Sequence, residues 1–136
     1  MNADGTSTHD ELSRYEPGLR VRREVMGDEF VDRALTRTRG TESESVQTAI
    51  TDLVWGGVWT RPGLERRDRS LLNIGLLTAL RAHEELAGHV RGALRNGLSR
   101  IEITEAVIHT SGYCGAPAAM SAMKVVQDVF DNTPDD

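Results

Sequence analysis

Apolar residues in this chain recur at helical spacing, and glycine or proline interrupts them between one group and the next. After the breaker Gly40, Val46, Ile50 and Leu53 lie three or four residues apart, which predicts a helix that ends near Gly56. No segment shows the strict alternation typical of a half-buried strand. The pattern predicts an all-α fold, a single-domain helical bundle of about six to seven helices.

Local signals predict where the other helices begin and end. Pro17 suits the first turn of a helix that runs through Met26, because its missing N–H has no partner there. Ser99 followed by Glu102 is typical of a capping box. Leu71 to Leu80 is apolar on more than one face, which predicts burial all round. The other expected helices cover 29–35, 84–95, 101 to about 112 and 118–130, with Asn96-Gly97 and Gly115-Ala116-Pro117 as breaks.

Length and composition fit one folded domain. The chain has 136 residues, of which 38% are hydrophobic, enough for a single core. Residues 1–13 are polar without apolar periodicity, and the acidic tail 132–136 contains a proline. We therefore expect disordered ends at 1–13 and 132–136 around a helical domain at 14–131.

Charge and cysteine content exclude several classes of protein. The net charge of -5 and the pI near 5.4 argue against a nucleic-acid partner. The longest apolar run is too short to span a bilayer, and the polar start of the chain lacks the apolar core of a signal peptide. The expectation is a soluble, cytoplasmic protein with no membrane partner. The single cysteine, Cys114, cannot form a disulfide within the chain.

Arginines cluster around one Pro-Gly turn. The segment WGGVWTRPGLERRDRS carries Trp55, Arg61, Arg66, Arg67 and Arg69. Planar guanidinium groups beside an indole suit bidentate binding of carboxylates, so the cluster suggests a small anionic ligand. The alternative is a solvated turn whose arginines pair with the many acidic side chains.

Glu85 and His89 lie four residues apart and so share a helix face, where the carboxylate can orient the imidazole and raise its proton affinity. The pair has the outline of an acid/base site, although spacing alone favours an exposed ion pair. His109, beside an apolar residue, is expected to be a core or interface histidine, and His83 needs no function. The central histidines lack the four-residue spacing of a helical metal motif, so no metal is expected.

Tyr113 and Cys114 lie at the expected break before the last helix. Side chains there can project into a cleft, and the backbone N–H groups that begin the next helix can face an anion. The position suits a carboxylate or oxyanion site. The alternative is that Tyr113 packs and Cys114 is a small buried residue.

The runs WTRPGL, RNGLSR and YCGAPAA, in this order, resemble the gamma-carboxymuconolactone decarboxylase family of the alkylhydroperoxidase-D-like superfamily. The resemblance covers about Arg14 to Phe130. It implies an all-helical subunit in a ring-like homo-oligomer, expected to be a hexamer, with no cofactor. The implied reaction is decarboxylation of gamma-carboxymuconolactone to the enol-lactone of 3-oxoadipate, in the beta-ketoadipate pathway of aromatic (protocatechuate) catabolism.

That chemistry suits the residues found, because the departing carboxylate is vinylogous to the lactone carbonyl and the substrate acts as its own electron sink. The protein needs to bind a dianion, stabilise an oxyanion and protonate carbon. Our hypothesis makes His89, oriented by Glu85, the general acid. The expected substrate-binding residues are Arg61 with one of Arg66, Arg67 and Arg69 as a carboxylate clamp, and Trp55, Tyr113 and Cys114 around the pocket.

Other members of the same superfamily run a dithiol cycle on a CxxC pair, which the lone Cys114 excludes here. Two alternatives stay open. One is a decarboxylase acting on a different lactone or a beta-keto acid. The other is a non-catalytic binding subunit in a biosynthetic pathway, for which Gly88, in mid-helix beside His89, is a sign of a changed pocket or of room for substrate.

Overall fold

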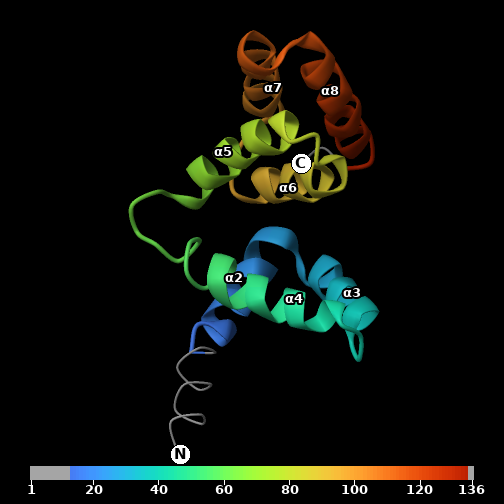
Figure 1. The fold of residues 1–136 in the computed structure, drawn as a ribbon. Helices are drawn as coiled ribbons and strands as arrows, with labels where there is room; N and C mark the ends of the chain where they lie inside the picture. Colours follow the sequence, from blue (N-terminus) through green and yellow to red (C-terminus); the bar gives the residue numbers. More distant parts are fainter. Residues whose placement is uncertain (1–12, 135–136) are drawn as a thin grey trace, which may run out of the picture. The chain divides into compact units, whose positions relative to one another are not determined.

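A computed structural model describes residues 13–134, and over that range the secondary structure is entirely helical, as predicted (Figure 1). The elements are α2 (Tyr15–Met26), α3 (Asp28–Thr38), α4 (Ser43–Ile50), the π-helix η1 (Thr51–Trp55), α5 (Arg66–Ala79), α6 (His83–Arg95), α7 (Arg100–Cys114) and α8 (Ala116–Asp131). They group into two compact units, Met1–Gly63 and Leu64–Asp136. No helix within residues 13–134 is long and apolar enough to cross a bilayer. Residues 1–12 and 135–136, most of the two ends expected to be disordered, lie outside the described range.

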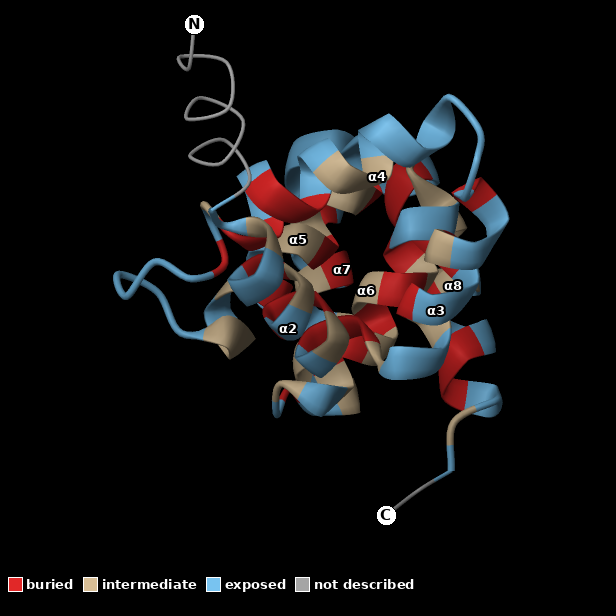
Figure 2. Ribbon diagram, turned by 90° about the horizontal axis from the view of Figure 1, so that it is seen from below, coloured by how far each residue is buried: buried red, intermediate tan, exposed pale blue. Residues whose placement is uncertain are grey.

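The unit Met1–Gly63 is built on the packing of α2 against η1, with α3 and α4 alongside. Its buried core combines aliphatic side chains with two stacked indoles, and consists of Val21, Val25, Met26, Val31, Trp55 and Trp59. Figure 2 shows the buried positions of α2. Gly18 makes the packing possible, because a Cβ atom there would lie 2.3 Å from the backbone oxygen of Thr51.

The apolar residues that recur at helical spacing along α4 and η1 are exposed in the chain. Val46 is 61% exposed and Leu53 55% exposed, whereas Thr51, Asp52 and Trp55 are buried. The buried residues have polar partners at and just before α2. Arg22 of α2 donates a hydrogen bond to Thr51 Oγ1 at 3.2 Å, and Arg14, which precedes α2, forms an ion pair with Asp52 at 3.4 Å. Polar side chains with such partners can be buried at low cost.

The unit Leu64–Asp136 is formed by α5 to α8 around a larger aliphatic core. Ile74, Leu86, Val90, Ile103 and Val126 are completely buried in it. The predicted capping box begins α7, since Ser99 accepts from the Glu102 N–H at 3.0 Å and the Glu102 carboxylate accepts from the Ser99 N–H at 2.9 Å. Asn96 donates to Ser70 Oγ at 2.8 Å and so ties the end of α6 to α5.

Burial of α5 all round, predicted from its apolar residues, is wrong for the single chain. Only Ser70, Ile74 and Thr78 of this helix are buried, while Leu72 and Leu76 are 55% and 48% exposed. The reason is that α6, α7 and α8 cover one side of α5 and leave the row at i and i+4 uncovered. An uncovered apolar row on a helix marks a surface suited to further association.

The break between the last two helices falls where the sequence predicts it, at the start of Gly115-Ala116-Pro117. Helix α7 continues through Cys114 and ends at Gly115, whose φ of 91° lies in the region that favours glycine. Beyond α8, Thr133 donates to the Val129 carbonyl at 2.7 Å and accepts from Arg100 at 3.0 Å. These contacts join Thr133, in the tail expected to be disordered, to α7 and α8.

We predict that Gly18→Ala lowers the free energy of unfolding by roughly 1–3 kcal/mol, because the new methyl group would overlap backbone atoms of Thr51 and Gly56 that cannot move independently. Urea denaturation followed by circular dichroism measures the change. Gly112→Ala is the control, since nothing lies within 4 Å of a Cβ there and a helical alanine should add up to about 1 kcal/mol. Equal effects of the two substitutions would contradict the close contact.

Candidate active site

His89 is the central residue of the candidate site. It lies on α6 between the buried positions Gly88 and Val90, and its ring is half-buried. Asn73 of α5 places its side-chain nitrogen 3.4 Å from His89 Nδ1. An amide N–H can donate to Nδ1 in the tautomer that carries the ring proton on Nε2.

Burial lowers the pKa of His89 from 6.5 to about 4, and the nearby negative charge of Glu85 raises it by a smaller amount. The sequence analysis expected Glu85 to increase the proton affinity of the ring. That effect has the expected sign, but the loss of hydration outweighs it, since a buried imidazolium cannot recover its hydration from one exposed carboxylate. His89 is therefore neutral in the resting protein at pH 7.

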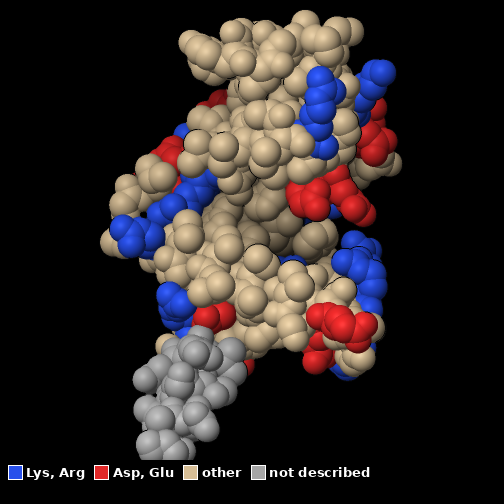
Figure 3. Space-filling model, in the orientation of Figure 1, with Lys and Arg blue, Asp and Glu red and all other residues tan. Residues whose placement is uncertain are grey.

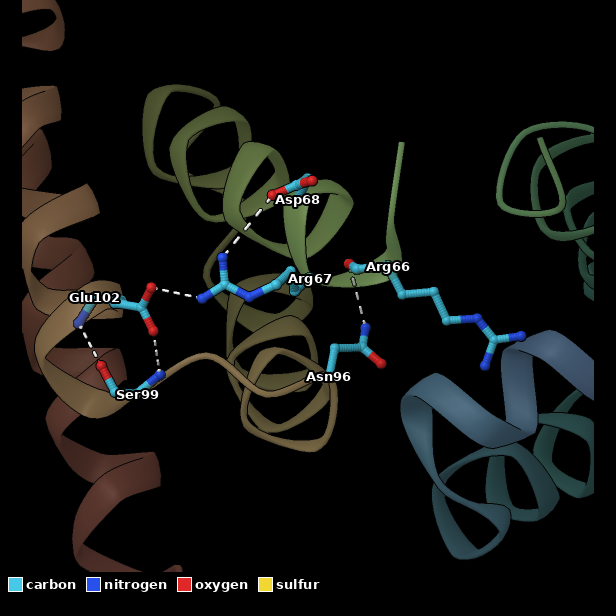
Figure 4. A network of polar contacts seen from close by, with 6 residues as sticks. All are labelled: Arg66, Arg67, Asp68, Asn96, Ser99 and Glu102. Carbon is cyan, nitrogen blue, oxygen red and sulfur yellow. Dashed lines mark hydrogen bonds and ion pairs between the residues drawn. The ribbon is translucent and has the colours of Figure 1, made fainter. Parts of the chain in front are cut away.

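The arginines of the predicted cluster do not act as one group. Arg66, Arg67 and Arg69 lie in the first turn of α5. Figure 4 shows the Arg66 side chain pointing away from Arg67 and Glu102, while its backbone carbonyl accepts from Asn96. Residues three apart on a helix share a face, so Arg66 and Arg69 lie on one face of α5, to which Arg67 does not belong.

Arg67 has a structural partner. Its guanidinium group contacts the Glu102 carboxylate at 2.5 Å and lies 4.0 Å from Asp68 (Figure 4). The hydrogen bond and charge of Glu102 raise the pKa of Arg67, and the Ser99 N–H, followed by Arg67, lowers the pKa of Glu102. Of the arginines predicted to bind substrate, Arg67 is the one that links α5 to the capping box of α7.

Two of the predicted residues belong to the unit Met1–Gly63. Trp55 is 5% exposed and stacks on Trp59, with 4.8 Å between ring centroids and 21° between planes. Its ring is thus part of that unit's core, and its role in shaping a pocket stays a prediction. Arg61 is exposed after the turn that follows η1.

Tyr113 and Cys114 end α7 and are both exposed, Tyr113 by 81%. The alternative that they pack in the interior of the chain is therefore wrong. The Tyr113 ring meets His109 with 5.0 Å between centroids, and His109 is exposed too, which places it at the surface instead of in the core. Among residues 13–134, no group of three or more His, Cys, Asp or Glu side chains could hold a metal ion.

A long stretch around this end of α7 carries no charge. No Asp, Glu, Lys or Arg occurs from residue 106 to residue 123. Figure 3 shows the corresponding region, at the α7–α8 turn, as a surface without charged side chains. Ile108 and Met120 are 55% and 67% exposed there. The surface is apolar enough to favour contact with another molecule.

Sequence reasoning missed Asn73. In the sequence, Asn73 is a polar residue within the apolar run from Leu71 to Leu80, and that interruption was the one available signal. Sixteen residues separate Asn73 from His89, so only the packing of α5 on α6 brings the two side chains together.

Comparison with known proteins identifies the family of this helical chain. The model of the carboxymuconolactone decarboxylase family matches residues 44–128, and the chain belongs to that family. A nitrosuccinic acid decarboxylase from Metarhizium robertsii is 44% identical over 99% of this chain and 94% of its own length. A 4-carboxymuconolactone decarboxylase from Acinetobacter baylyi is 41% identical over 86% of this chain and 87% of its own. An uncharacterised 15.0 kDa protein from Paracoccus denitrificans is 31% identical over 63% of this chain and 66% of its own.

Two of these relatives are decarboxylases, which supports a carboxy-lyase as the class of this protein. Their names give different substrates, so the similarity supports the reaction class without selecting a substrate. The helical fold predicted from the sequence and the family resemblance are both confirmed.

The lowered pKa of His89 predicts a specific dependence of stability on pH. The folded pKa of about 4 lies below the unfolded value of 6.5, so the unfolded chain binds more protons between these values. The contribution of His89 is full above pH 6.5 and is lost as the pH falls toward 4, by up to about 3 kcal/mol. Urea denaturation across this range should show a steeper loss for the wild-type protein than for His89→Gln. Parallel curves would contradict the burial of a neutral ring.

Proposed function

We propose that this protein decarboxylates a small dicarboxylic acid without a cofactor, and that gamma-carboxymuconolactone is its substrate. The observation that carries the proposal is the half-buried imidazole of His89, whose pKa burial lowers to about 4 and whose Nδ1 lies 3.4 Å from the side-chain nitrogen of Asn73. A buried imidazole whose ionisation is strongly shifted is typical of a functional site. The similarity to two decarboxylases supports the reaction class.

The proposed reaction breaks one carbon–carbon bond and forms one carbon–hydrogen bond. The electron pair of the bond to the departing carboxylate moves through the ring double bond to the lactone carbonyl oxygen, and carbon dioxide leaves. The resulting dienolate then accepts one proton on carbon to give the enol-lactone. No external oxidant or electron sink is needed, so side chains that bind anions and deliver a proton are sufficient.

His89 is proposed as the proton donor. Its ring is neutral at rest, and a bound dianion would favour the imidazolium form, since a nearby negative charge raises a histidine pKa. The ring would therefore take up a proton together with the substrate and return it to the dienolate carbon. Glu85, whose charge already favours the imidazolium, would assist this uptake.

A second substrate deserves the same test, because the Metarhizium robertsii relative matches nearly the whole chain. In nitrosuccinic acid the nitro group is attached to the carbon that bears one carboxylate. Loss of carbon dioxide there leaves a nitronate, whose charge lies on the nitro oxygens as that of the dienolate lies on a carbonyl oxygen. Both substrates are dianions that release carbon dioxide into an oxygen-centred acceptor, so one site could serve either.

Assembly of several copies is part of the proposal. The exposed apolar row of α5 and the uncharged surface around the α7–α8 turn would be buried by contact with other copies. We propose a homo-oligomer, with a hexamer as the state expected from the family resemblance. A non-catalytic subunit would keep these surfaces without needing the perturbed imidazole, which is why we favour the enzyme.

We predict that the purified protein releases carbon dioxide from enzymatically generated gamma-carboxymuconolactone, and that His89→Ala lowers kcat at least about a hundredfold, the usual loss when a general acid is removed. Nitrosuccinic acid is assayed in parallel, and the larger kcat/KM identifies the substrate. His83→Ala is the control, because it removes another imidazole of α6 to which no function is assigned. Near-normal turnover by His89→Ala would contradict the role of His89, and turnover of neither acid would contradict the function.

We also predict that Arg61→Lys raises KM about tenfold, because lysine cannot make the paired hydrogen bonds of a guanidinium group to a carboxylate. Steady-state kinetics on the substrate identified above measures the change. Arg33→Lys is the matched control, since Arg33 forms an exposed ion pair with Glu29 within α3. An unchanged KM for Arg61→Lys would remove Arg61 from the proposed carboxylate clamp.

A further inference from the structure

We propose that Asn73 is the positioning residue of His89: its amide donates to Nδ1, keeps the ring proton on Nε2 and so makes Nε2 the nitrogen that serves the substrate. The inference rests on the proposed function for its consequence in catalysis. Its structural part concerns the resting protein and can be tested without any substrate.

The first step concerns which atoms of the two side chains can donate or accept a hydrogen bond. A neutral imidazole has one donor nitrogen and one acceptor nitrogen, and whichever group bonds to one of them fixes the other. The Asn73 side-chain nitrogen faces Nδ1 at 3.4 Å, so Nδ1 holds the lone pair and Nε2 holds the proton. The carboxylate of Glu85 acts on the ring as a charge that favours protonation, which does not by itself select one ring nitrogen.

The second step concerns the packing around Asn73, because a side chain can position another one only if its own position is fixed. Asn73 precedes Ile74, which is completely buried in the core shared by α5 and α6. One turn earlier on α5, Ser70 is buried and accepts from Asn96 at the end of α6. The spacing of α5 and α6 is therefore fixed by apolar and polar contacts on both sides of the His89 contact.

The third step concerns the ability of the Asn73 amide both to donate and to accept a hydrogen bond. Asparagine has an NH₂ donor and a carbonyl acceptor on one rotatable group, and a half turn exchanges them. It can donate to Nδ1 of the neutral ring and accept from Nδ1–H of the imidazolium. Aspartate could only accept, which would favour a proton on Nδ1, and leucine could do neither. Asn73 therefore suits a histidine that is neutral at rest and protonated during turnover.

The test uses the full-length protein labelled with ¹⁵N-histidine, without substrate, at pH 7. Two-bond ¹H–¹⁵N correlation spectra distinguish a protonated ring nitrogen from one with a lone pair, and loss of a signal in His89→Ala assigns His89 among the four histidines of the chain. We expect the wild-type ring to show Nε2–H alone, Asn73→Leu to show a mixture of both tautomers, and Asn73→Asp to move the proton to Nδ1. A wild-type ring with Nδ1–H, or spectra unchanged in both variants, would overturn the inference.

Kinetics on the decarboxylated substrate then measure the consequence. Asn73→Asp and Asn73→Leu should lower kcat at least about tenfold with KM changed less than about twofold, because the substrate-binding groups are intact while the ring presents the wrong nitrogen. Asn96→Leu is the matched control, since it removes another asparagine contact between α5 and α6. It should destabilise the protein without changing the His89 tautomer; a tautomer change as large as that of Asn73→Leu would reduce Asn73 to a structural residue.

The two proposals fail separately. If the tautomer shifts as expected but His89→Ala keeps its turnover, the inference about Asn73 stands and the proposed function of His89 falls. If His89→Ala is inactive and the tautomer is unaffected by both Asn73 variants, the proposed function stands and the inference falls.

Discussion

The packing of α5 against α6 is the contact on which the candidate site depends. Ile74 of α5 and Leu86 and Val90 of α6 are completely buried in one aliphatic core, which fixes the two helices relative to each other. Asn73 precedes Ile74 and His89 precedes Val90, so the packing of these two core residues fixes where the polar pair lies. Because the apolar contacts supply most of the stability, the polar pair is placed at little additional cost in free energy.

The same burial determines the electrostatics of the site. Partial removal of the His89 ring from water lowers its pKa to about 4, and the charge of Glu85 offsets only part of that shift. A ring that is neutral at rest and near an acidic side chain can change its protonation when an anion binds, which is the behaviour that the proposed decarboxylation requires. Among the arginines of the predicted cluster, Arg67 contacts the Glu102 carboxylate and so supports the start of α7.

Helix type and many helix boundaries were predictable, because they depend on local signals. The Ser99–Glu102 capping box and the glycine stops act within a few residues of the chain, where sequence spacing equals spatial proximity. The inward face of α4 and η1 was not predictable in this way. There Arg14, just before α2, and Arg22 on α2 provide partners for Asp52 and Thr51, and a polar side is buried in place of the apolar one.

The sequence alone determined the helical fold, the family and His89 as the residue to examine, because periodicity, caps and motif order are properties of the linear chain. The tertiary structure decided what surrounds that residue. Asn73 reaches His89 across sixteen residues of sequence, and burial reverses the direction in which Glu85 alone would move the pKa of the ring. Both effects arise from packing between helices. The spacing of residues along one helix does not determine its distance from another helix or how much water the two exclude.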